Sequence, residues 1–179
     1  EEVDEEHEKR EAELASTAHD ASVAEVLPEV TTAVVAVCSG DGLVELFAQL
    51  GVQGVVTGGQ TMNPSTAELL ETVQRVNADQ VLVLPNTKNI IPVADQLDAL
   101  PEKAVVVVPT RSMPEALAAL VAYDADAPAI DNAAEMTDAA ASVVTGEVTR
   151  AVRDSTSSVG EIGEGDWLGL VRGDGIAAV

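Results

Sequence analysis

The chain has 179 residues and a formal net charge of −22, with 46% hydrophobic but only 2% aromatic residues. This length suits one full-sized domain, and the scarcity of aromatic residues requires an aliphatic core. The charge disfavours nucleic acid and anionic membranes as partners, because phosphate groups are bound by clustered Lys and Arg. A generally acidic, solvated surface is the simpler explanation of this charge.

No apolar run approaches the ~18 residues that a membrane span needs, so we expect no membrane insertion. The acidic N-terminus lacks the basic and then apolar order of a signal peptide. The single cysteine, Cys38, cannot form an internal disulfide and fits a reducing compartment. These features together predict a cytoplasmic protein.

Residues 1–30 differ in composition from the rest, being strongly acidic and free of glycine. Glu, Ala and Leu favour helix, but the apolar positions form only a weak stripe. We therefore expect a solvated, helical interdomain linker here. Both histidines, His7 and His19, fall in this segment and are better explained as exposed residues than as metal ligands.

From residue 31 the pattern changes to four strand–helix units. The predicted strands are continuous apolar runs, which is typical of strands covered on both faces. A helix in each interval gives right-handed βαβ crossovers. We predict an α/β fold whose parallel sheet of four or more strands has helices on both faces. The strands are expected over 31–37, 53–57, 80–85 and 104–110, and the helices over 43–50, 65–76, 90–100 and 115–123.

Two of the predicted helices have candidate N-caps. Asn63 or Ser65 can cap the second helix, with Glu68 placed to complete a capping box. Asp131 or Asn132 can cap a later helix that reaches about residue 144.

The last part of the chain has a different texture. Residues 146–155 alternate as a half-exposed strand would, and Gly173-Asp174-Gly175 between apolar runs predicts an antiparallel hairpin. We therefore divide the chain into an α/β domain over 31–155 and a β-hairpin region over 156–179. We expect this region to lead into a further C-terminal domain of a longer protein.

The loops that follow the four strands are the candidate site. In an open parallel sheet, ligands bind outside the carboxyl ends of the strands. Glycines there let the backbone approach a ligand, and helix N-termini favour an anion. The alternative is that small polar residues merely make good turns. The candidate anion- or substrate-binding residues are Ser39, Gly40, Gly42, Thr57, Gly58, Gly59, Gln60, Thr61, Asn63, Ser65, Asn86, Lys88, Asn89, Thr110 and Arg111.

The placement of basic residues supports an anion. Between residues 31 and 149 the only basic residues are Arg75, Lys88, Lys103 and Arg111. Lys88 and Arg111 fall in the loops of the proposed site. In so acidic a chain, this placement predicts a bound phosphate or carboxylate.

Several established catalytic patterns are absent. The chain has no GxxxxGK[ST] string, and Gly40-Asp41-Gly42 lacks the third glycine of a dinucleotide turn. No histidine follows His19, so the core cannot assemble a Ser-His-Asp or Cys-His pair. One cysteine without a nearby histidine cannot complete a zinc site, and no metal ligands are predicted. Cys38 could have a lowered pKa at a helix start, or it could be a structural thiol.

The strings VAVCSGDGLVELFAQLGV, GGQTMNPST and LPNTKNI closely resemble the central region of the dihydroxyacetone-kinase-like family. The best-understood member of this family is the ATP-binding subunit of bacterial fatty acid kinase. The resemblance covers roughly residues 31–179. It implies a three-part protein in which an N-terminal domain binds ATP and magnesium, so that no cofactor is expected in these residues. A C-terminal domain would dock the fatty-acid carrier protein.

The resemblance also implies a function. The parent would transfer the γ-phosphoryl group of ATP to a carrier-bound fatty acid, giving an acyl phosphate for phospholipid synthesis. The central region would contribute homodimerisation and, through Cys38 in VC-x-G-x-G, part of catalysis. Two alternatives remain open: a purely structural module for dimerisation or partner binding, and part of a dihydroxyacetone kinase-like enzyme.

Overall fold

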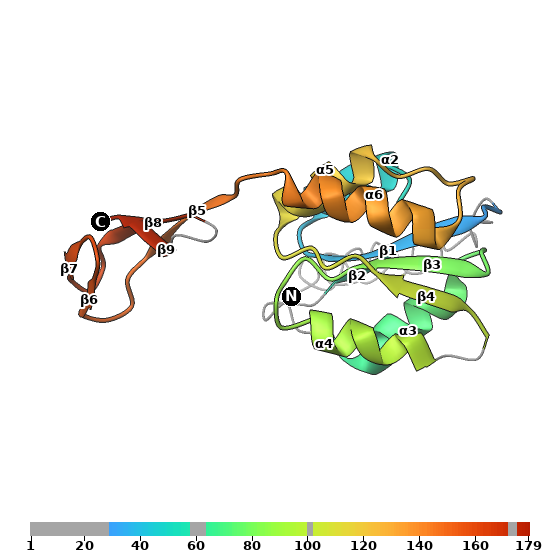
Figure 1. Ribbon diagram of the computed structural model, residues 1–179. Coiled ribbons are helices and arrows are strands. Elements are labelled where there is room, and N and C mark those ends of the chain that lie inside the picture. Colours follow the sequence, from blue (N-terminus) through green and yellow to red (C-terminus); the bar gives the residue numbers. More distant parts are fainter. Residues whose placement is uncertain (1–28, 58–63, 100–101, 172–174) are drawn as a thin grey trace, which may run out of the picture.

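The computed structural model describes residues 29–57, 64–99, 102–171 and 175–179 of the chain. Nearly all of the predicted linker therefore lies outside the described residues. So do five candidate site residues of the second loop, Gly58, Gly59, Gln60, Thr61 and Asn63. The described residues form a layered α/β domain, followed by a small β-structure that a short tether joins to it (Figure 1).

The α/β domain is built on a four-stranded sheet in the order β2-β1-β3-β4, with every pair parallel. Its strands are β1 (Thr32–Cys38), β2 (Gly54–Thr57), β3 (Gln80–Leu84) and β4 (Ala104–Val107). All seven residues of β1 are buried, as expected for a central strand covered on both faces. The predicted α/β fold with a parallel sheet is confirmed.

Helices cover both faces of the sheet (Figure 1). Helices α2, α5 and α6 lie on one face, and α3, α4 and the 3₁₀ helix η2 lie on the other. Successive side chains of a strand point to opposite faces, so Val34 and Cys38 join the first core while Val35 and Val37 join the second. The helices are α2 (Asp41–Gln49), α3 (Thr66–Arg75), α4 (Ile91–Ala94), η2 (Asp95–Ala99), α5 (Met113–Val121) and α6 (Ala129–Ala141).

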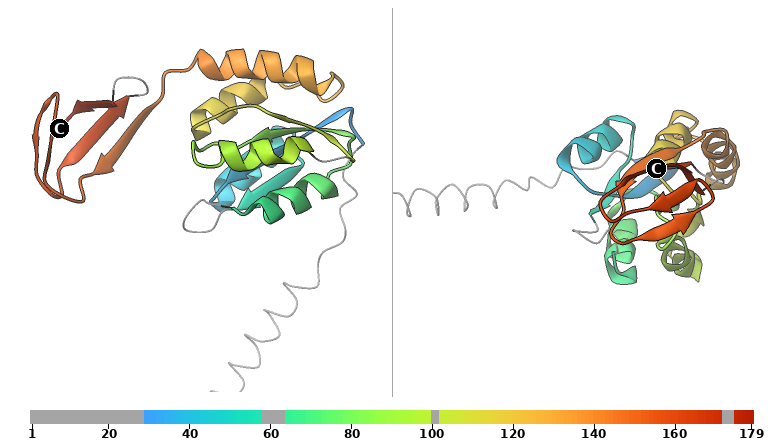
Figure 2. Two further views of the ribbon diagram at one scale, coloured as in Figure 1. Left: turned by 60° about the horizontal axis from the view of Figure 1, so that its bottom comes forward. Right: turned by 90° about the vertical axis from the view of Figure 1, so that its left-hand side faces the viewer.

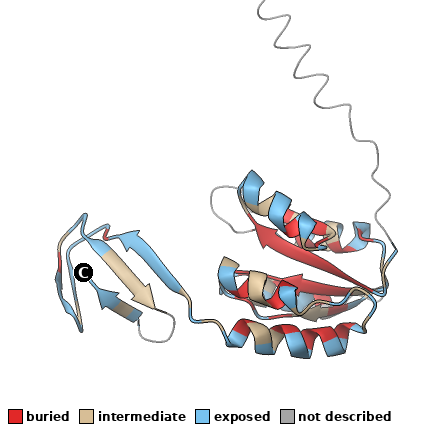
Figure 3. Cartoon of the chain, turned by 90° about the horizontal axis from the view of Figure 1, so that it is seen from above, coloured by how far each residue is buried: buried red, intermediate tan, exposed pale blue. Residues whose placement is uncertain are grey.

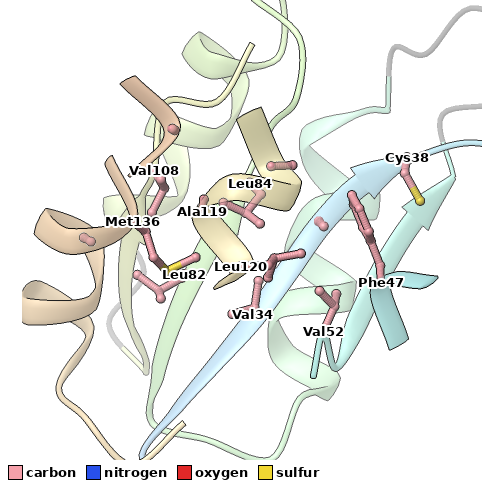
Figure 4. Close-up of a cluster of buried hydrophobic side chains, with 14 of the residues drawn as sticks. Val34, Cys38, Phe47, Val52, Leu82, Leu84, Val108, Ala119, Leu120 and Met136 are labelled. Atoms are coloured by element: carbon pink, nitrogen blue, oxygen red, sulfur yellow. The ribbon is translucent and has the colours of Figure 1, made fainter. Parts of the chain in front are cut away.

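Both cores are aliphatic, as the composition predicts. Figure 4 shows the first of them, in which Phe47 of α2 and Met136 of α6 are the bulky members among Val, Leu and Ala. Figure 3 shows the consequence: buried residues run along the strands and the inner sides of the helices, while the outer sides are exposed.

Two helices differ from the sequence prediction. The helix expected over 90–100 is one α-helical turn, α4, continued by η2; with Pro92 at its start and Pro101 just beyond it, the segment is too short for a long α-helical hydrogen-bond ladder. Helix α6 begins earlier than predicted, with Pro128 at its N-cap. Asn132 instead lies in the first turn, where its side-chain amide donates to the Asp124 carbonyl at 2.7 Å and thereby fastens the loop before α6.

The C-terminal β-unit, residues 146–171 and 175–179, contains two small antiparallel sheets. One has the order β5-β8-β9 and the other pairs β6 with β7. The predicted antiparallel region is confirmed, but strand 146–150 is exposed along its whole length and pairs with β8. The strands are β5 (Gly146–Arg150), β6 (Ser155–Ser157), β7 (Gly160–Ile162), β8 (Trp167–Val171) and β9 (Gly175–Ala178).

Residues 142–145 connect α6 to β5 as a tether (Figure 2). The β-unit stands at the side of the α/β domain where the parallel strands end (Figures 1 and 2). Among the residues that the structure describes, no helix is long and apolar enough to cross a membrane.

Candidate functional site

The strand order places the candidate site at the carboxyl ends of β1 and β3. These strands are neighbours, and the helices that follow them, α2 and α4, lie on opposite faces of the sheet. Such a reversal opens a crevice at the strand ends, where ligands of open α/β sheets bind. The register pairs Cys38 with Thr57 and Ala36 with Leu84, so these ends lie near one level.

Asn86 fixes the geometry of this edge. It has a φ of 58°, the only positive φ among the described residues other than glycine, and Asn tolerates this conformation better than most residues. Its buried amide Nδ2 donates to the Val37 carbonyl at 2.8 Å. The Thr110 hydroxyl donates to Asn86 Oδ1 at 2.7 Å and accepts from the Asn86 backbone N–H at 3.2 Å.

Asn86 and Thr110 are therefore a clamp that ties the ends of β1, β3 and β4 together. Asn86 is 3% exposed and Thr110 is fully buried. Their polar atoms are directed at one another and at the backbone, which suits them to hold the neighbouring loops in place rather than to contact a ligand directly. As ligand contacts, these two residues remain predictions.

Two helix N-termini at this edge are already occupied by the protein's own carboxylates. Ser65 caps α3, as predicted, and Glu68 completes the capping box by accepting from the Ser65 N–H at 2.7 Å. These hydrogen bonds hold the pKa of Glu68 below its usual value. At α5, Ser112 is the N-cap, and Glu115 accepts from the Arg111 N–H at 2.9 Å. The exposed Ser65 is thus committed to its helix.

The start of α2 is open by contrast. Gly40 has a φ of 95° and caps the helix without a side chain, a conformation that favours glycine. A Cβ added at Gly40 or Gly42 would meet no atom within 4 Å, so the backbone is accessible there. The exposed carboxylate of Asp41 lies in the same turn. Of the other candidates, Ser39 is half-buried beside Gly40, and Thr57 and Asn89 are exposed.

Cys38 points away from this edge. It is fully buried in the first core, close to Phe47 in Figure 4. Burial raises the pKa of the Cys38 thiol, so the predicted lowering by the helix dipole is wrong. The side-chain alternation of β1 decides this, because it sends Cys38 to the α2 face of the sheet. The geometry gives no support to a nucleophilic role.

The basic residues separate into two pairs. At the amino edge of the sheet, Arg75 forms an ion pair with Glu71 at 2.9 Å, and Lys103 donates to the Gln74 and Val76 carbonyls. At the carboxyl edge, Lys88 and Arg111 are exposed. No ion pair involves either side chain within the described part of the chain.

Lys88 and Arg111 line one cavity of about 550 Å³, together with Ser112 and Pro114. The opposite wall comes from the tether and the β-unit. It is formed by Thr145, Gly146, Glu147, Leu170, Val171 and Gly175. The volume lies in the range of small-molecule sites. The sequence indicates the two cations but not the opposite wall, because no local pattern predicts that strands 146–150 and 167–171 pair and return to this edge.

The described residues do not fit the nucleotide and magnesium that the resemblance implies for the parent protein. No group of three His, Cys, Asp or Glu side chains among them could hold a metal ion. The N-termini of α3 and α5, which could have received a phosphate, already hold their own carboxylates. We derive no nucleotide chemistry from this part of the chain.

Comparison with known proteins supplies the family. Residues 33–179 match the FakA-like C-terminal family, which describes the C-terminal region of proteins similar to fatty acid kinase FakA. The chain belongs to this family. Its description assigns the region to the C-terminal part of such proteins, whereas the sequence prediction places it in the centre of the parent.

Curated bacterial proteins resemble the chain over most of its length. An uncharacterized protein of Staphylococcus haemolyticus is 41% identical over 85% of the chain, and Protein YloV of Bacillus subtilis is 40% identical over 78%. An uncharacterized protein of Staphylococcus aureus is 36% identical over 80%. The chain spans only 28%, 25% and 26% of these three relatives, respectively.

Proposed function

We propose that this chain is a non-nucleotide-binding part of a fatty-acid-kinase-like phosphotransferase, and that its carboxyl edge holds an anionic group during transfer. The parent would make acyl phosphate from ATP and carrier-bound fatty acid. ATP and magnesium would be bound by other parts of the parent, and the carrier protein would deliver the acyl group.

One observation carries the proposal. Lys88 and Arg111, whose side chains form no ion pair within the described residues, line the same cavity at the ligand-binding edge of the sheet. In a chain of net charge −22, two such cations in one cavity are a specific feature. Phosphoryl transfer depends mainly on positioning and on stabilising charge. Lys and Arg suit that task, because both bind phosphate and Arg can do so through two hydrogen bonds.

The test is phosphoryl transfer by the full parent protein carrying both Lys88→Gln and Arg111→Gln. Loss of cationic stabilisation of a transferring group typically lowers the rate by ~100-fold or more. Arg75→Gln is the matched control, since it removes a positive charge from the opposite edge of the sheet. Equal rates in the double variant and the control would refute the proposal.

A second candidate function, an association module, is favoured by the exposed valines along β5. Val144, Val148 and Val152 are 81%, 71% and 85% exposed, and β5 is an edge strand of its sheet. Exposed apolar edge strands pair readily with other chains, and a homodimer of this kind is our alternative proposal. Light scattering of the wild type and of Val148→Lys tests it: a dimer that the substitution dissociates supports association, and a monomeric wild type contradicts it.

A further inference from the structure

The C-terminal β-unit has little apolar packing to hold it over the cation-bearing edge. No residue after Ala140 belongs to either core cluster of the α/β domain, within the described part of the chain. Inside the β-unit, the buried hydrophobic residues so far as the structure describes them are Ala151 and Ile162. The placement of the β-unit therefore depends on the tether, residues 142–145, and on polar interactions across the cavity.

The cavity contains one negative and two positive side chains. Glu147, in β5 directly after the tether, lines the same cavity as Lys88 and Arg111. No pair of them approaches to ion-pair distance, since the ion pair found among the described residues is Arg75–Glu71. A cavity of this volume is roughly 10 Å across, about one Debye length at physiological salt, so the opposite charges still attract one another.

We propose that Glu147 is an internal competitor for the anion site. Its carboxylate would draw the β-unit onto Lys88 and Arg111 when no ligand is present. An anionic ligand would displace it, and the β-unit would then be freed to move on its tether. This inference rests on the proposed function, because it assigns a regulatory group to the same anion site.

The expected strength is modest. Exposed ion pairs contribute little to stability, which corresponds to a change of about 1.5-fold to 5-fold in the ratio of closed to open β-unit. Such a balance can be shifted by millimolar anion or by salt, as a displaceable latch requires. A much stronger pair would exclude the ligand.

The chain provides its own probe of this motion. Trp167 is the only tryptophan; it lies in β8, and the Arg150 guanidinium sits 4.7 Å from its ring centroid. Its fluorescence anisotropy decay in the 179-residue chain therefore reports how freely the β-unit moves against the α/β domain. Small-angle scattering gives an independent measure of how far the two parts separate.

Four variants make the test specific. Glu147→Gln and the pair Lys88→Gln with Arg111→Gln each break the attraction, and both should lower the slowly decaying anisotropy and enlarge the particle. Glu161→Gln is the matched control, because it removes the same charge from an exposed site of the same β-unit. The charge exchange Glu147→Arg with Arg111→Glu should restore wild-type mobility.

Inorganic phosphate completes the experiment. Against sodium chloride of equal ionic strength, it should mobilise the wild-type β-unit and should bind Glu147→Gln about 1.5-fold to 5-fold more tightly than wild type. The inference is overturned if Glu147→Gln behaves like Glu161→Gln, or if phosphate binds both proteins equally. These outcomes leave the proposed function intact, since that fails only when loss of Lys88 and Arg111 leaves phosphoryl transfer unchanged.

Discussion

Replacing Asn86 by alanine tests the clamp that organises the candidate site. The substitution removes the hydrogen bonds to the Val37 carbonyl and from the Thr110 hydroxyl. Each lost bond costs about 1 kcal/mol, with more where a buried group is left unsatisfied. Alanine at a φ of 58° adds about 1 kcal/mol of strain. We expect Asn86→Ala to lower the free energy of unfolding by about 3 kcal/mol.

Urea unfolding followed by far-ultraviolet circular dichroism measures this change. Thr110→Val should cost about 2 kcal/mol, and the double variant should cost less than the sum, because the two residues share their hydrogen bonds. Asn89→Ala, an exposed position in the same loop, is the control and should change stability by less than about 0.5 kcal/mol. A comparably small effect for Asn86→Ala would refute the clamp.

Single residues of other types provide further tests. Cys38, the only cysteine, should react with a thiol reagent at least about 100-fold more slowly in the folded chain than in urea, because the thiol is buried; fast reaction of the folded chain would contradict its placement. Burial, with Asp124 and Asp126 nearby, raises the pKa of Tyr123 to about 12. Its proton is held more tightly in the folded state, so the contribution to stability is intact below about pH 10 and is lost, by roughly 2 kcal/mol, as the pH rises towards 12; Tyr123→Phe should lack this loss, which unfolding measured across that pH range would show. Trp167 fluorescence should report a lower urea midpoint than circular dichroism, since the β-unit has so small a core; coincident transitions would show that the two parts unfold together.

The α/β domain could be predicted from the sequence because its signals are local. Continuous apolar strands, amphipathic helices and capping residues such as Ser65 each act within a few residues. Long-range hydrogen bonds caused the miss at α6. Its first N–H, from Ala129, is capped by the Gln80 side chain at 2.9 Å, from a strand far away in the sequence. That interaction frees Asn132 to hold the preceding loop instead.

The candidate site was predictable in its cations but not in its geometry. Lys88 and Arg111 stand out in an acidic chain by composition alone. Whether a loop residue faces a ligand or ties the loop down depends on tertiary contacts, and Asn86 shows this, since its αL backbone and buried amide leave no trace in the sequence. The direction of Cys38 depends on strand register, where a shift of one residue would turn its side chain to the opposite face.

The most direct test of the anion site is a titration of the isotopically labelled chain with acetyl phosphate, a small acyl phosphate, followed by two-dimensional amide NMR. We predict saturable shifts centred on Lys88, Arg111 and Ser112, which are abolished by Lys88→Gln with Arg111→Gln and retained in Arg75→Gln. Shifts that are absent, that do not saturate, or that persist in the double variant would contradict an anion site at this edge of the sheet.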